Sequence, residues 1–157
     1  LSIKGNYAPA LNNLGIMYLR KRDFSRALVA FKRARKENRF SKTPNFNLAS
    51  LYLQFGQYEL ALSSLKPLAS SSTTDVDVLN MVGTGFLMKN DAKQAVSWFE
   101  KIPTEFLEKD HFGINYALAL YQSGQNKKAQ DIWEDIDVTQ NYSEYYKLVG
   151  RHIGGRK

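Results

Sequence analysis

The sequence repeats itself at an interval of 34 residues, four times over. Alanine recurs at Ala27, Ala61, Ala95 and Ala129, and a bulky apolar residue recurs four positions after each of them. The matching sets also include Gly15, Ala49, Gly83 and Ala117; Leu14, Leu48, Val82 and Tyr116; Tyr18, Tyr52, Phe86 and Leu120; and Phe31, Leu65, Phe99 and Trp133. Such regular recurrence of small and large residues indicates one supersecondary unit stacked on copies of itself.

The spacing inside each repeat is helical. In the first copy Leu11, Leu14, Gly15 and Tyr18 recur at steps of three and four, which places them on one face of a helix. A polar break follows at 21–23, and a second run of apolar residues then shows the same spacing. We therefore predict two antiparallel helices per repeat, which approach each other closely through their small residues.

The motif L-x-x-L-G-x-x-Y, followed by alanine, phenylalanine and alanine, resembles the tetratricopeptide repeat family. Its residues in the four copies are Leu11, Leu14, Gly15, Tyr18, Ala27, Phe31 and Ala34; Leu48, Ala49, Tyr52 and Ala61; Leu79, Val82, Gly83, Phe86, Ala95 and Phe99; and Tyr116, Ala117, Leu120, Ala129 and Trp133. The resemblance covers 8–143 and implies an all-α fold, a right-handed α-solenoid of antiparallel helix pairs. The family's closing proline is absent, and the positions hold Arg39, Thr73, Leu107 and Asn141 instead.

The period also predicts the domain boundaries. We expect the four repeats at 8–41, 42–75, 76–109 and 110–143. A capping helix at 144–153 and a frayed tail at 154–157 should follow, and 1–7 is expected to be the end of a preceding repeat.

Turn and cap residues agree with this division. Pro9 and Pro44 fit the first turn of a helix, and Gly56 and Gly124 fit the turns between paired helices. The N-cap candidates are Asp23 and Asp91 for second helices, and Thr43, Asp75 or Asp77, and Asp110 for first helices.

The net charge of +7 is unevenly distributed. Residues 1–41 carry +8, whereas 110–143 carry −3. The basic side chains gather on the second helix of the first repeat, at Arg26, Lys32, Arg33, Arg35, Lys36 and Arg39. A solvated helix face and a docking patch for an acidic protein are both open interpretations. Nucleic acid and anionic membrane are less favoured, because no aromatic residues alternate with these cations as stacking platforms.

The resemblance further implies that the first helix of each repeat lines a concave groove. The side chains that would face it are Asn12, Asn13, Ile16, Arg20, Phe46, Asn47, Ser50, Gln54, Asn80, Met81, Thr84, Met88, Ile114, Asn115, Leu118, Tyr121 and Gln122. Asn13, Asn47 and Asn115 occupy one repeat position, and a carboxamide can pair with the backbone of an extended peptide. The alternative is that these amides bond to their own neighbours.

These features favour a non-catalytic scaffold that holds an extended or helical segment of another protein in the groove. The sequence has no cysteine, and its two histidines, His111 and His152, lack the spacing of metal ligands, so we expect no cofactor, metal or small-molecule substrate. Self-association is the alternative, with the basic first repeat meeting the acidic fourth repeat of another copy. Light scattering across a salt series tests this alternative, because a chain that stays monomeric at low ionic strength excludes it.

Overall fold

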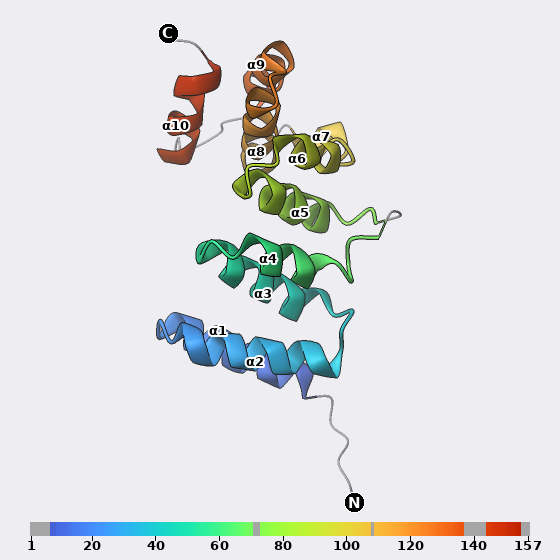
Figure 1. Cartoon of the computed structure of the whole chain (residues 1–157), viewed down its shortest axis with the longest axis vertical. Helices are drawn as coiled ribbons and strands as arrows, with labels where there is room; N and C mark the ends of the chain where they lie inside the picture. The colour runs from blue at the N-terminus through green and yellow to red at the C-terminus, as the bar shows by residue number, and fades with distance from the viewer. Residues whose placement is uncertain (1–6, 71–72, 108, 137–143, 155–157) are drawn as a thin grey trace, which may run out of the picture. The chain divides into compact units, whose positions relative to one another are not determined.

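The computed structural model describes residues 7–70, 73–107, 109–136 and 144–154. Within these ranges the chain forms ten helices, which Figure 1 labels in order. They are α1 (Ala8–Arg20), α2 (Phe24–Glu37), α3 (Lys42–Gln54), α4 (Tyr58–Leu65), α5 (Val76–Met88), α6 (Ala92–Phe99), α7 (Thr104–Leu107), α8 (Asp110–Gln122), α9 (Asn126–Asp135) and α10 (Glu144–Ile153). None of these described helices is both long and apolar enough to cross a bilayer. The expected end of a preceding repeat falls on residues that, except for Tyr7, lie outside the described ranges.

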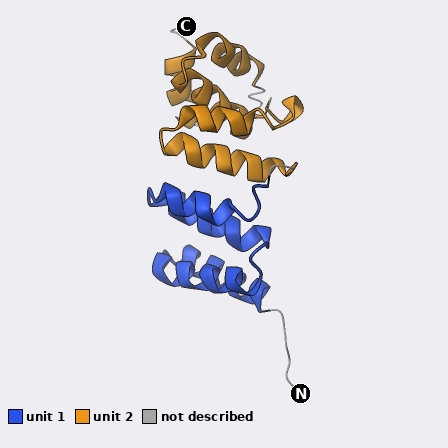
Figure 2. Cartoon of the chain, turned by 45° about the vertical axis from the view of Figure 1, so that its right-hand side comes forward, with its two compact units in different colours: residues 1–71 blue, residues 72–157 orange. Residues whose placement is uncertain are grey.

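The helices group into two compact units, coloured separately in Figure 2: unit 1, Leu1–Ser71, and unit 2, Ser72–Lys157. In unit 1, α1 packs on α2, α3 packs on α4, and α2 also contacts α3. In unit 2, α5 packs on α6 and α8 on α9, while α10 packs against both α8 and α9. The predicted all-α fold of consecutive helix pairs is confirmed in both units.

Small residues on the first helix of a pair make room for a ring on the second. A methyl group added at Gly15 would overlap the ring of Phe31, and one added at Gly83 would lie 2.6 Å from Cε1 of Phe99. Both phenylalanines are fully buried. The second repeat has Ala49 and Leu65 at these two positions, a larger residue opposite a smaller one, so the sum of the two volumes is roughly kept.

The turn between paired helices has the same conformation in all four repeats. The residue at one repeat position has a positive φ in each copy: Arg22 at 58°, Gly56 at 68°, Asn90 at 65° and Gly124 at 85°. In each turn the next N–H donates back across the helix end to the carbonyl five residues earlier, at 2.8–2.9 Å, as in a Schellman motif. The turn positions of Gly56 and Gly124 are confirmed; Arg22 and Asn90 were missed, although they lie 34 residues from the glycines.

Arg22→Gly is expected to raise the free energy of unfolding by about 1 kcal/mol, because the left-handed conformation is costly for a residue with a Cβ. Asn90→Gly should gain less, since asparagine tolerates this region better than arginine. Urea denaturation measures both changes. Gly56→Ala is the matched control and should lose stability; a loss of stability in Arg22→Gly would contradict the assignment.

Side-chain caps begin three of the helices. Asp23 Oδ1 accepts from the N–H of Arg26 at 3.1 Å, and Asp91 Oδ1 accepts from the N–H of Gln94 at 3.2 Å. Asp75 Oδ1 accepts from the N–H groups of Asp77 and Val78 at 3.1 and 3.3 Å. These three caps were predicted and are confirmed.

The other cap candidates are wrong, because each of them lies within its helix and not at the residue before it. Thr43 is the second residue of α3, whose N-cap is Ser41. Asp77 lies inside α5, and Asp110 is the first residue of α8, whose N-cap is Lys109.

Repeats two and four lack the aspartate cap of repeats one and three. The equivalent N-cap residues are Gln57 and Gln125, and neither makes a side-chain cap bond. Gln57→Asp and Gln125→Asp should therefore each raise the free energy of unfolding by about 1 kcal/mol. Thermal denaturation of each variant checks this, with Gln57→Ala as a control that should change little. No gain in either aspartate variant would mean that α4 and α9 start elsewhere.

Candidate functional site

In unit 1 the predicted groove side chains fall on α1 and α3. Asn13, Arg20, Ser50 and Gln54 are exposed, whereas Ile16, Phe46 and Asn47 are half-buried. Asn12 is only 5% exposed. Its Oδ1 accepts from Nδ2 of Asn47 at 2.7 Å, so the two amides tie α1 to α3. The prediction that Asn12 offers an open contact is therefore wrong, because its acceptor oxygen is used inside the unit.

A small polar cavity lies between the first residues of α1 and α3. We call it the amide pocket; its volume is about 270 Å³, and its lining residues are Ala8, Pro9, Asn12, Asn13, Asn38, Ser41, Thr43 and Pro44. Asn13 and Asn38 are the exposed amides of this set, and Ser41 and Thr43 add hydroxyl groups. The pocket therefore combines donors and acceptors with two proline rings, a lining suited to a backbone segment with small side chains.

In unit 2 the equivalent face is partly covered. Ile114 is 4% exposed and belongs to the same buried cluster as Val149 and Ile153 of α10. The prediction of an open apolar contact at Ile114 is wrong, because α10 packs on α8.

The amide of Asn115 is also occupied within unit 2. Its Nδ2 donates to Oγ1 of Thr84 at 3.2 Å, and its Oδ1 accepts from the hydroxyl of Tyr145 at 3.0 Å. Partial burial raises the pKa of Tyr145 above its usual value, so the hydroxyl keeps the proton that it donates. Both ends of this carboxamide therefore bond to neighbours, the alternative that the sequence left open.

The remaining predicted positions of unit 2 differ in access. Asn80, Met81, Thr84 and Leu118 are half-buried, and Met88, Tyr121 and Gln122 are exposed. Oδ1 of Asn80 is buried and has no hydrogen-bond partner among the described residues. Unit 1 therefore offers the more open polar face.

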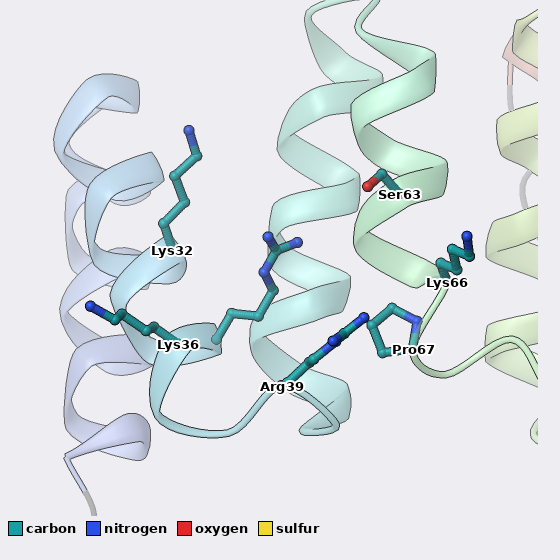
Figure 3. A pocket seen from close by; sticks show the side chains of 7 residues that line it. Lys32, Lys36, Arg39, Ser63, Lys66 and Pro67 are labelled. Carbon is teal, nitrogen blue, oxygen red and sulfur yellow. The ribbon is translucent and has the colours of Figure 1, made fainter.

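The basic residues divide into two groups. Lys32, Arg35, Lys36 and Arg39 line a cavity of about 580 Å³, together with Ser63, Lys66 and Pro67 at the end of α4 (Figure 3). We call it the cationic cavity. Arg26 and Arg33 are not among its lining residues, and Arg26 instead pairs with Asp23 at 3.4 Å. Lys66 was missed by sequence reasoning, although it lies 34 residues after Lys32 and so occupies the same repeat position.

The chain was compared with protein-family models, with curated proteins and with solved structures. No family model matches the chain. Among curated proteins it is similar to the BBSome complex member BBS4 of Xenopus tropicalis, at 22% identity over 130 residues that cover 83% of this chain but 25% of that protein. The chain thus spans about a quarter of the length of this relative.

Two solved structures resemble the whole chain. A tetratricopeptide repeat protein from Parabacteroides merdae ATCC 43184 superposes with a TM-score of 0.79 at 19% identity, covering 97% of this chain and 61% of that one. YrrB, a TPR protein with an unusual peptide-binding site, superposes with a TM-score of 0.67 at 14% identity, covering 94% of this chain and 78% of that one. The chain therefore has the tetratricopeptide-repeat fold, a solenoid built from antiparallel helix pairs.

Proposed function

We propose that this chain is a non-catalytic scaffold that binds an extended or helical segment of another protein along α1 and α3 of unit 1. Two solved structures share the fold, and one of them, YrrB, has a peptide-binding site. Solenoids of stacked helix pairs present long surfaces that suit polypeptide partners. Protein interaction is therefore the function that the fold supports, and the location on unit 1 is our own inference.

The observation that carries the proposal is the open polar surface beside the amide pocket. Asn13, Ser50 and Gln54 are exposed on α1 and α3, and Asn13 also lines the pocket. Asn47 donates through Nδ2 to Asn12, which fixes the orientation of its carboxamide before any ligand arrives. Groups of this kind can pair with the main chain of a bound peptide, and their fixed geometry lowers the entropy cost of binding.

Unit 2 is the poorer candidate for the same role. Asn115 occupies the repeat position of Asn13 and Asn47, but Thr84 and Tyr145 already use both ends of its amide. A peptide would have to displace Tyr145 before it could bond to Asn115. We therefore assign the peptide site to unit 1.

Peptides selected from a random displayed library against the whole chain provide the test. Asn13→Arg with Ser50→Arg places two long side chains on the proposed surface and should weaken the selected peptides about tenfold or more, by calorimetry. The matched control, Gln94→Arg with Ser97→Arg, makes the same chemical change at exposed positions of α6 and should leave affinity unchanged. Equal affinity for both double variants would place peptide binding elsewhere.

A further inference from the structure

We propose that the cationic cavity binds an acidic stretch of a partner polypeptide. The cavity lies between α2 and the end of α4, both second helices of their repeats. It is distinct from the surface of α1 and α3, so the inference does not depend on the proposed peptide site. The two surfaces can be tested separately.

The charge of the cavity is the first argument. Five of its seven lining residues are cations: Lys32, Arg35, Lys36, Arg39 and Lys66. None of these lining residues, all within the described part of unit 1, is acidic. Residues 7–70 hold eleven Lys or Arg against three acids, and one of the acids, Asp23, pairs with Arg26 outside the cavity. Cations gathered without carboxylates repel one another and attract an anionic ligand.

The fold holds several of these cations in place, which is the second argument. Nη1 of Arg35 donates to Oγ of Ser64 at 3.4 Å, and Nζ of Lys32 lies 6.0 Å from the centroid of the Tyr52 ring. Asn45 is fully buried, and its Nδ2 donates to the carbonyls of Arg39 and Ser41 at 2.8 Å each. The loop that carries Arg39 is therefore fixed from inside, and less ordering is needed when a ligand binds.

The shape and lining identify the occupant. A volume of about 580 Å³ lies within the usual range of ligand clefts, about 300–1,000 Å³. The cations come from α2, the loop after it and the end of α4, and Figure 3 shows Arg39 reaching toward Pro67 beside Lys66. Carboxylates spaced along one chain can meet several of them at once, and the two guanidinium groups can each bind a carboxylate with two hydrogen bonds.

Single-stranded nucleic acid fits the cavity less well than an acidic peptide. Such ligands gain affinity by stacking bases on aromatic side chains. The described lining residues include no aromatic ring, and their uncharged members are Ser63 and Pro67. The cavity therefore offers charge without stacking, which favours carboxylates.

Fluorescence anisotropy with a labelled hexaglutamate peptide and the whole chain tests the proposal. Arg39→Gln with Lys66→Gln removes two exposed cations, one from the loop after α2 and one from the end of α4, and should weaken binding about tenfold, as expected for two exposed ion pairs. The matched control, Lys21→Gln with Arg33→Gln, removes the same charge from unit 1 outside the cavity and should change affinity less than about threefold. Equal circular dichroism melting curves show that both variants fold.

Three outcomes would overturn the proposal. If both double variants bound hexaglutamate equally weakly, the loss of affinity would come from the lower net charge of the chain and not from the cavity. Equal binding of hexaglutamate and hexaglutamine would exclude charge recognition. Tighter binding of a labelled oligothymidylate, lost only in the cavity variant, would assign the cavity to nucleic acid. The proposal is supported if the chain binds hexaglutamate more tightly than hexaglutamine or oligothymidylate, and if the cavity variant alone loses this binding.

Discussion

Gly15→Ala is expected to lower the free energy of unfolding by about 2 kcal/mol, as measured by urea denaturation. The added methyl group would overlap the ring of Phe31, which is fully buried. Alanine is intrinsically better than glycine in a helix by about 1 kcal/mol, so the observed loss is what remains after that gain. Overpacking of this buried contact is the reason.

A second substitution should restore part of this loss. Phe31→Leu alone leaves a cavity and should cost about 1–2 kcal/mol. Combined with Gly15→Ala, it recreates the Ala49–Leu65 pair of the second repeat, so the double variant should be more stable than the sum of the single losses predicts. Simple additivity in this double-mutant cycle would contradict the equivalence of the two repeats. Gly83 and Phe99 allow the same cycle in unit 2.

Asn45→Ala should cost about 3 kcal/mol of stability, the second large effect. Asn45 is fully buried, and its Nδ2 donates to the carbonyls of Arg39 and Ser41. Its removal leaves two carbonyls without this donor and opens a small cavity. Because these bonds fix the loop that carries Arg39, the variant should also bind the hexaglutamate peptide more weakly than the parent chain.

Two further variants separate hydrogen bonding from volume at this position. Asn45→Asp keeps the shape but replaces the donating NH₂ with an acceptor, so it should cost at least as much as alanine at neutral pH. Asn13→Asp, at an exposed amide of the same unit, should change stability by less than about 0.5 kcal/mol. A mild effect of Asn45→Asp would show that the two carbonyl bonds contribute little.

The helix pairs could be predicted from the sequence because their information is local and repeated. The spacing of Leu11, Gly15 and Tyr18 indicates which face of the helix is buried. One such row of residues could belong to any buried helix, but its recurrence in four copies indicates a repeat fold. Arg22 and Asn90 were missed because neither is glycine: arginine rarely adopts a positive φ, and asparagine adopts one more readily than arginine but less readily than glycine. Their distance of 34 residues from Gly56 and Gly124 is the signal that could have revealed them.

The candidate sites depended on contacts that a repeat pattern does not encode. Ile114 is buried because α10 packs on α8, and the 34-residue pattern does not extend into α10. Oδ1 of Asn12 is not available to a ligand because it accepts a hydrogen bond from Asn47. Asn47 lies 35 residues after Asn12, one residue more than the repeat period, so the 34-residue pattern does not predict this pair. Lys66 lies far from the basic run in sequence, and the packing of α2 on α3 and of α3 on α4 brings it to the same cavity as Arg39.

The structure also shows a longer alternation. Repeats one and three share a Gly–Phe contact, a non-glycine residue at positive φ and an aspartate cap. Repeats two and four have alanine at the position of that glycine, glycine at positive φ, and glutamine at the N-cap. The pattern therefore has a second period of two repeats, and each compact unit contains one repeat of each kind.

The central claim is that the chain contains four copies of one helix pair, and both candidate sites lie between two such copies in unit 1. The sharpest measurement is the backbone φ of Arg22 and Asn90 in solution, read by NMR from the HN–Hα coupling and the intraresidue HN–Hα NOE. The account predicts positive φ at both, as at Gly56 and Gly124. Negative φ at Arg22 or Asn90 would show that the turns are not equivalent and would contradict the repeat architecture.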